Sequence, residues 1–149
     1  MTSTDSNLGE LIYTRIWDAP RELVFECMTT PEHLTHFWGP IGASTPLANI
    51  VVELHAGGRF ETIMVDDASG AEYPMKGVFV EVIPPEKLAW TEADVEGGMT
   101  TSITFNDIGD GKTETIALQT NVPEWARTPE AQAGMLSSFD KMAAYLATL

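Results

Sequence analysis

The chain has 149 residues and a formal charge of −14, from 22 acidic and 8 basic side chains. This length suits one domain with a buried core, and a composition of 44 % hydrophobic and 20 % charged residues is typical of a globular protein. A surface this negative repels the phosphates of nucleic acids and anionic membrane lipids, so we expect neither as a partner.

Cys27 is the one cysteine of the sequence, so the chain can form neither an internal disulfide nor a cysteine-based zinc site. Residues 1–10 lack the basic and apolar pattern of a signal peptide, and the apolar runs are too short to cross a membrane. We therefore expect a cytoplasmic protein. Because linkers and repeats are missing, we expect one domain over residues 1–149, with residues 1–7 flexible.

The first predicted elements are a strand and two short helices. Strand-favouring side chains predict a strand over residues 8–18. Pro20 lies in the first turn of a helix that runs to residue 28, because proline is tolerated there. A cap, a proline and an acid, Thr30-Pro31-Glu32, then open a second short helix, which ends before Gly39-Pro40.

Six further strand-like runs follow a loop over residues 41–49. They cover residues 50–54, 59–65, 73–83, 87–92, 99–105 and 113–120. In the fifth run, Met99, Ile103 and Phe105 lie with Thr101 on one face and alternate with small polar residues at 100, 102 and 104, which is typical of a half-buried strand. The short gaps between the runs favour an antiparallel meander, and Gly57-Gly58 predicts one of its turns.

A long helix closes the chain. Thr128-Pro129-Glu130 repeats the cap, proline and acid signature. Its apolar stripe, with spacings of 4, 3, 4 and 3, consists of Met135, Phe139, Met142, Leu146 and Leu149. The sheet is the only large hydrophobic surface available to this stripe. The residues therefore predict an α+β fold, in which a curved antiparallel sheet carries two short helices and a long C-terminal helix across it.

Several motifs along this framework resemble a known family, that of homologues of the activator of heat shock protein 90 ATPase. The motifs are Asp18-Ala19-Pro20-Arg21-Glu22, Pro31-Glu32-His33-Leu34, Trp38-Gly39-Pro40, Gly57-Gly58-Arg59-Phe60, Gly77-Val78-Phe79 and Pro84-Pro85-Glu86-Lys87-Leu88. The family belongs to the START-like, or SRPBCC, superfamily, and the resemblance covers Leu11–Leu149. It implies a helix-grip (START-like) fold. Met135 stands where the family often has tryptophan, which implies a different surface on this helix.

The resemblance leaves three functions open. Family members include co-chaperone domains and antibiotic self-sacrifice resistance proteins, and relatives in the superfamily bind lipids, hormones or polyketides or cyclise them. The chain could thus bind a ligand without catalysis, act as a polyketide-type cyclase, dehydratase or hydrolase, or serve as a chaperone-interaction domain. An isolated sheet edge also makes a homodimer possible.

We place binding of a small hydrophobic or aromatic molecule first, in a cavity between the sheet and the C-terminal helix. Methionine adapts to irregular ligands, whereas tryptophan and tyrosine add a polar group to a stacking surface. The predicted ligand-binding residues are Trp38, Phe60, Tyr73, Trp90, Met135, Phe139 and Met142. Either Tyr73 or Trp90 would supply an orienting hydrogen bond, and we expect no cofactor.

Catalysis would instead need a buried acid or base, for which Glu61, His36 and Tyr73 are the first candidates. The alternation leaves open whether Glu61 or Thr62 faces inward, because one register slip exchanges them. Nothing forms a recognisable nucleophile–base set, so we predict no catalytic residue. Thr91, Ser138 and Trp125 are further polar candidates.

Other reactive side chains have simpler interpretations. His33 and His36 could approach one metal ion, but a third ligand at a fitting spacing is missing, so we predict no metal site. Cys27 is expected to be a buried, inert thiol beside Val24 and Met28. The acidic residues gather at turns and strand ends, which indicates a solvated shell and places function in the apolar interior.

Overall fold

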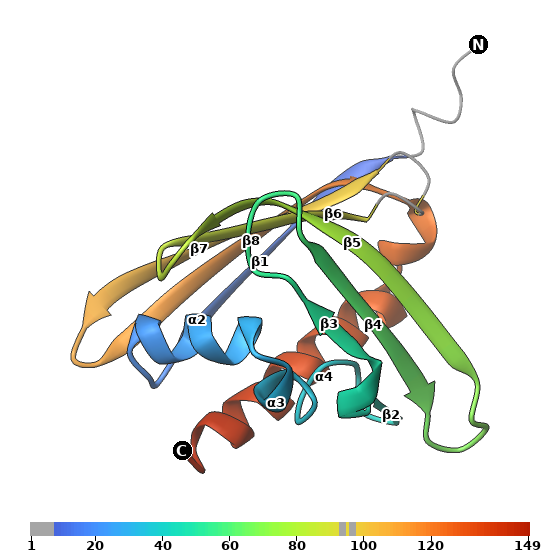
Figure 1. Cartoon of the computed structure of the whole chain (residues 1–149), viewed down its shortest axis with the longest axis horizontal. Coiled ribbons are helices and arrows are strands. Elements are labelled where there is room, and N and C mark those ends of the chain that lie inside the picture. Colours follow the sequence, from blue (N-terminus) through green and yellow to red (C-terminus); the bar gives the residue numbers. More distant parts are fainter. Residues whose placement is uncertain (1–7, 93–94, 96–97) are drawn as a thin grey trace.

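The computed structural model describes residues 8–92, 95 and 98–149, so residues 1–7, which we expected to be flexible, lie outside the described part. An antiparallel sheet arches over three helices on one of its faces (Figure 1). Its strand order is β1-β8-β7-β6-β5-β4-β2, and β3 pairs with β4. The strands are β1 (Gly9–Trp17), β2 (Ala43–Ser44), β3 (Ile50–Val52), β4 (Arg59–Asp66), β5 (Glu72–Ile83), β6 (Lys87–Glu92), β7 (Met99–Gly109) and β8 (Lys112–Val122).

The helices lie on the concave face of the sheet. They are α2 (Arg21–Thr29), α3 (Pro31–Leu34) and α4 (Pro129–Leu146). Two short 3-10 helices, η1 (Leu47–Asn49) and η2 (Glu124–Ala126), lie in the connections. The long helix α4 crosses beneath the sheet, and its C-terminal end comes close to α3 (Figure 1). This is the predicted α+β helix-grip arrangement, with a curved antiparallel sheet, two short helices and a long C-terminal helix.

The predicted alternation determines which side chains enter the core. In β7, Met99, Thr101, Ile103 and Phe105 are buried, as the sequence pattern predicts. Each faces the helices, because neighbouring side chains of a strand point to opposite faces of the sheet. The core formed in this way includes the edge-to-face pair Phe25–Phe105, with ring centroids 5.1 Å apart, which joins α2 to the sheet.

Helix α4 begins where its cap signature predicts. The Thr128 hydroxyl accepts a hydrogen bond from the Ala131 amide at 3.1 Å, and Pro129 occupies the first turn. Met142 and Leu146 are buried, whereas Met135 and Phe139 are partly buried against the core. Leu149 lies beyond the end of α4 and is 57 % exposed, so the predicted stripe is one residue too long.

Tertiary contacts also created elements that periodicity did not indicate. The loop over residues 41–49 contains β2, which pairs with β4 through Ala43 and Ser44, and it also contains η1. The second helix ends at Leu34 and continues as turns to Trp38. At the β3–β4 connection, the backbone of Glu53 lies so close to residue 58 that only glycine fits. A Cβ on Gly58 would lie 2.0 Å from the Glu53 carbonyl oxygen. Within the described part of the chain, every helix is too short or too polar to span a membrane.

Candidate functional site

A cluster of aromatic rings lies on the concave face where β4, β5 and β6 adjoin. Phe60 stacks on Phe79 with centroids 5.3 Å apart, and it meets Trp90 edge-to-face at 5.0 Å. Trp38, on the turn after α3, meets Phe60 at 5.2 Å and Trp90 at 6.4 Å. Aromatic pairs at these separations favour offset or edge-to-face geometry, so the cluster is firmly packed.

A row of inward-facing side chains leads from this cluster to the surface. We call it the β4–β5 track, and it consists of the cross-strand pairs Phe60–Gly77, Thr62–Met75 and Met64–Tyr73. Phe60 and Thr62 are each 1 % exposed at the inner end, Met64 and Met75 are half-buried, and Tyr73 is 52 % exposed at the outer end. The track therefore grades from buried aromatic surface to solvent over three neighbouring pairs.

Trp90 stands at the inner end of the track because Gly77 makes room for it. A Cβ at Gly77 would lie 3.2 Å from Trp90 Cδ1, 3.0 Å from the Phe60 carbonyl oxygen and 3.4 Å from Met75 Sδ. The pyrrole edge of the indole thus lies directly over β5. Any side chain at position 77 would displace that edge or strain the β4–β5 pairing.

The polar groups of this region include one carboxylate, that of half-buried Glu92, which pairs with Gly77 across β5 and β6 and shares the inner face with Trp90. The neutral polar atoms are paired with one exception. Trp38 Nε1 donates to Thr62 Oγ1 at 3.2 Å, and Gln119 Nε2 donates to Thr101 Oγ1 at 3.3 Å. Trp90 is only 5 % exposed, yet its Nε1 has no hydrogen-bond acceptor among the described residues. A buried donor without a partner costs about 1–3 kcal/mol, so native folds rarely retain one without a reason.

The turn that carries Trp38 is fastened to α4. Ser138 Oγ donates to the Phe37 carbonyl at 2.8 Å, and Ser137 Oγ accepts from the Ile41 amide at 3.1 Å. The Lys141 ammonium donates to three carbonyls of the same loop, at 3.0 Å for Gly39, 3.4 Å for Pro40 and 3.3 Å for Ala43. Burial lowers the pKa of Lys141 below its ordinary value.

The seven predicted ligand-binding residues occupy four places. Trp38, Phe60 and Trp90 form the aromatic cluster, and Tyr73 lies at the exposed outer end of the track. Phe139 contacts the other half of the sheet, with its ring centroid 5.8 Å from Tyr13 and 6.0 Å from Trp17. Met142 is 1 % exposed within the core, and Met135 packs partly buried against it.

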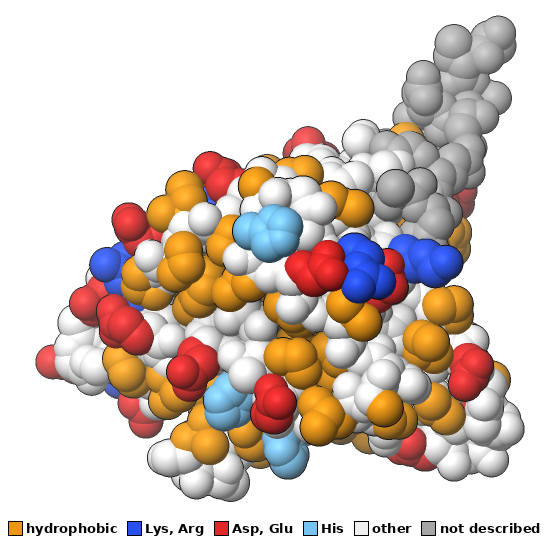
Figure 2. All heavy atoms as spheres, in the orientation of Figure 1, with side chains coloured by type: hydrophobic (Ala, Val, Ile, Leu, Met, Phe, Trp, Pro, Cys, Tyr) orange, Lys and Arg blue, Asp and Glu red, His pale blue; other side chains and the backbone are white. Residues whose placement is uncertain are grey.

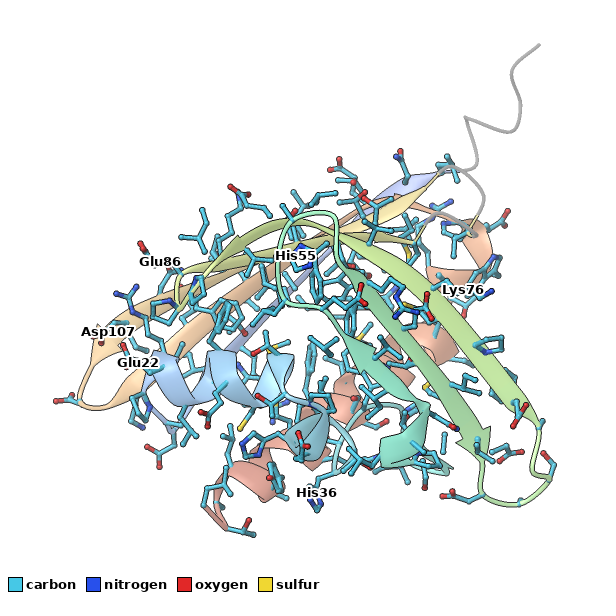
Figure 3. All side chains as sticks on the ribbon, viewed as in Figure 1. Glu22, His36, His55, Lys76, Glu86 and Asp107 are labelled. Atoms are coloured by element: carbon cyan, nitrogen blue, oxygen red, sulfur yellow. The ribbon has the colours of Figure 1, made fainter. Side chains whose placement is uncertain are left out.

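The three candidates for an acid or base do not converge on the cluster. Glu61 faces the opposite side of β4 from Thr62, which settles the open register, and its carboxylate lies 4.0 Å from Arg59. His36 stacks on Tyr145 at 4.5 Å, below α3 and away from the sheet, whereas His55 lies at the β3–β4 turn (Figure 3). Tyr73 is half exposed at the rim of the sheet.

Cys27 and the neighbouring histidines form a separate group between α2, α3 and the end of α4. His33 Nδ1 lies 2.5 Å from the Tyr145 hydroxyl, and its Nε2 lies 3.4 Å from the Glu26 carboxylate. Burial, together with the nearby Glu26, raises the pKa of the Cys27 thiol to about 11. At neutral pH the thiol is therefore protonated and a poor nucleophile, in line with the expected inert residue.

The remaining polar candidates have local partners or face solvent. Thr91 shares a 2.8 Å hydrogen bond with Thr100, Ser138 is bound to the Phe37 carbonyl, and Trp125 is 67 % exposed. Within the described residues, no three side chains of the metal-binding types converge on one point. An open depression of about 270 Å³ lies away from the aromatic cluster and is lined by Leu8, Gly9, Glu10 and Asn121.

Sequence reasoning missed four contributors to this region: Met64, Met75, Gly77 and Thr101. A signal for two of them was present, because residues 75 and 77 share a strand face with Phe79 in any regular β-strand. Met64 and Thr101 follow in the same way from Phe60 and Ile103. The alternation within one strand does not say which residues of the neighbouring strands pair with it, so the assembled face could not be predicted.

Comparison with known proteins shows relatives of this chain in both sequence and fold. A family model described as "Activator of Hsp90 ATPase homolog 1-like protein" matches residues 18–147. No curated protein matches the chain.

Among solved structures, a protein from Nitrosomonas europaea is 25 % identical, with a TM-score of 0.81 and 97 % of each chain covered. A protein from Chromobacterium violaceum is 23 % identical, with a TM-score of 0.82, covering 91 % of this chain and 96 % of that one. An AHSA1-like protein from Aeromonas hydrophila is 21 % identical, with a TM-score of 0.78, covering 94 % and 93 %. These structures share the fold of the chain, and the family match over most of its length shows that it belongs to the family of Activator of Hsp90 ATPase homolog 1-like proteins.

Proposed function

We propose that this protein binds a small hydrophobic or aromatic molecule, without catalysis, on the concave face of its sheet beside α4. The single observation that supports this most is the β4–β5 track, which grades from solvent at Tyr73 to the buried ring of Phe60. Ligand sites in proteins combine apolar, aromatic walls with a few fixed polar groups, and the track has this composition.

The predicted acid and base candidates lie off the track, which favours binding over catalysis. Along β4 the buried polar side chain is Thr62, whereas Arg59 and Glu61 face the other side and interact with each other. The one carboxylate that the described residues place on the inner face beside the track is that of Glu92, which pairs with Gly77. General acid–base chemistry needs a titratable group within reach of the substrate. The candidates Glu61 and His36 both lie outside the cluster, as described above.

Binding requires side chains of the track to move, because the rings of Trp38, Phe60 and Trp90 are in contact in this structure. Met64 and Met75 are suited to this, since methionine is unbranched and adopts several rotamers at low cost. Met64 also lies against the turn after α3, where a Cβ on Gly39 would be 2.9 Å from its sulfur. Ligand entry would thus shift methionines while the sheet keeps its pairing.

Burial of an aromatic ligand supplies a modest affinity. Removing about 200 Å² of apolar ligand surface from water is worth about 5 kcal/mol at about 25 cal/mol per Å². Immobilising the ligand and reordering the methionines offset part of this. A gain of about 5 kcal/mol corresponds to a dissociation constant of about 0.2 mM, so we expect values from about 0.2 mM to a few millimolar for unoptimised aromatic probes.

The test is thermal unfolding at rising concentrations of single-ring and two-ring aromatic compounds and medium-chain lipids. A ligand at about 100 times its Kd stabilises the native state by about 2.7 kcal/mol, so a true ligand raises Tm with concentration. Met75→Lys places a charge in the track and should abolish the shift. Val78→Lys makes the same kind of change on the opposite face of β5, at a residue 42 % exposed, and should leave it intact.

Two results would contradict the proposal. One is a panel in which every compound leaves Tm unchanged up to its solubility limit. The other is a shift of equal size in the Met75→Lys variant, which would place the ligand elsewhere. Each variant must first show a cooperative unfolding transition, so that loss of binding is not loss of fold.

A further inference from the structure

The unpaired indole of Trp90 distinguishes it from the other tryptophans. Trp17 Nε1 donates to Thr115 Oγ1 at 2.8 Å, and Trp38 Nε1 donates to Thr62 Oγ1 at 3.2 Å. Trp125 is 67 % exposed and can be hydrated. Trp90 alone combines 5 % exposure with an N–H that meets no acceptor among the described residues.

The position of this N–H connects it with the track. Nε1 adjoins Cδ1 in the indole ring, and Cδ1 is the indole atom closest to the vacant Cβ position of Gly77, at 3.2 Å. The donor therefore belongs to the edge of the ring that lies over β5, at the inner end of the β4–β5 track. An acceptor atom carried in along Tyr73, Met75 and Gly77 would reach this edge first.

The charges around the track argue against an anionic ligand, because the carboxylate of Glu92 shares the inner face with Trp90 and pairs with Gly77. Lys76 lies on the outer side of β5 (Figure 3), and Arg59 is paired with Glu53 at 2.9 Å. Lys141, at the turn after α3, already donates to three backbone carbonyls. A ligand carboxylate bound at Trp90 would give up its hydration shell and gain a single hydrogen bond from a neutral donor. That exchange is strongly unfavourable in an apolar interior.

We propose that the ligand is a neutral, flat apolar molecule with one oxygen acceptor, of the ketone or aldehyde class, bound through that oxygen to Trp90 Nε1. This rests on the proposed binding function and gives it a chemical class. Pairing a buried donor that is otherwise unsatisfied contributes enough to favour the carbonyl compound over its hydrocarbon analogue about tenfold.

Three probes of nearly equal shape test this: acetylnaphthalene, isopropenylnaphthalene and naphthoate, substituted at the same ring position. The second replaces the carbonyl oxygen by a methylene group, and the third replaces the methyl group by a charged oxygen. Their dissociation constants are measured by calorimetry for the native chain, for Trp90→Phe and for Trp17→Phe. The set of acetophenone, α-methylstyrene and benzoate repeats the comparison with a smaller ring.

We expect the ketone to bind the native chain about tenfold more tightly than the alkene, and the carboxylate to bind most weakly. Trp90→Phe should equalise ketone and alkene, whereas Trp17→Phe, which removes an indole with a partner, should keep the preference. If Trp90→Phe does not fold, the carbonyl stretching frequency of the ketone bound to the native chain decides. A shift to lower frequency relative to hexane supports the hydrogen bond, and a hexane-like frequency overturns it.

The outcomes separate the two proposals. Equal binding of ketone and alkene by the native chain, or a ketone preference that survives Trp90→Phe, overturns the anchor and leaves the binding function intact. Tightest binding of naphthoate or benzoate overturns the neutral class. If all six probes fail to bind, both proposals fall together.

Discussion

Replacing Gly77 by alanine tests the packing on which the site depends. The added Cβ would lie 3.0 Å from the Phe60 carbonyl oxygen, 3.2 Å from Trp90 Cδ1 and 3.4 Å from Met75 Sδ. Ordinary contacts begin near the longest of these distances, so the indole and the strand must each give way by a few tenths of an ångström. The sulfur can move easily, but the carbonyl is held in the pairing of β4 with β5.

Overpacking of this kind costs about 1–3 kcal/mol, and replacing glycine by alanine recovers about 0.4–1 kcal/mol from the unfolded chain. We therefore expect Gly77→Ala to lower the free energy of unfolding by about 1–2 kcal/mol. For a chain of this size that corresponds to a Tm about 3–6 °C lower. Urea titration and thermal unfolding, both followed by circular dichroism, measure the two quantities.

Gly134 provides the matched control. It lies within α4, and a Cβ there would meet only the Pro40 Cβ at 3.5 Å, an ordinary contact. Because alanine favours a helix by about 1 kcal/mol over glycine, Gly134→Ala should raise stability by about 0.5–1 kcal/mol. If Gly77→Ala proves as stable as the native chain, the fit of Trp90 over β5 is wrong.

Three further changes have calculable outcomes. Thr62→Val should lower the free energy of unfolding by about 1 kcal/mol, because Trp38 Nε1 loses its acceptor, and should cost much less in a Trp38→Phe background; a full cost in both would refute the hydrogen bond. The free energy of unfolding should fall as pH rises from about 9 to about 11, because the Cys27 thiol loses its proton near pH 9 in the unfolded chain and near pH 11 in the folded chain. Cys27→Ala should reduce this alkaline decline, and an identical decline in the variant would contradict the raised pKa. Lys141→Met should lower the free energy of unfolding by about 1–2 kcal/mol in urea, since three loop carbonyls lose a charged donor, and an unchanged midpoint would show that the clamp contributes nothing.

The elements that sequence patterns predicted well are those with a local physical cause. Thr128 caps α4 where a hydroxyl precedes a proline, and the alternation through β7 buries the residues that it should bury. By contrast, β2 is two residues long and exists because Ala43 meets Asp66 across the sheet. A strand of that length has too few residues to show a period.

The sequence indicated the types of residue that line the candidate site, but not how those residues are arranged. Trp38, Phe60 and Trp90 do meet, yet the sequence could not tell that Phe139 packs on the far half of the sheet or that Tyr73 lies at the exposed rim. The unpaired state of Trp90 Nε1 depends on where every nearby oxygen lies, which is a property of the complete fold. Acidic side chains lie scattered over the viewed surface (Figure 2), as the prediction of a solvated acidic shell requires.

Ligand binding at the β4–β5 track is tested most directly by an amide and indole NMR titration of the native chain with acetylnaphthalene. We expect the largest chemical-shift changes on the track and on the Trp90 indole N–H, which should move in the direction of stronger hydrogen bonding. The indoles of Trp17 and Trp125 should change little. Changes confined to the outer face of the sheet or to the exposed β1 edge, with the Trp90 indole unmoved, would contradict binding at the track.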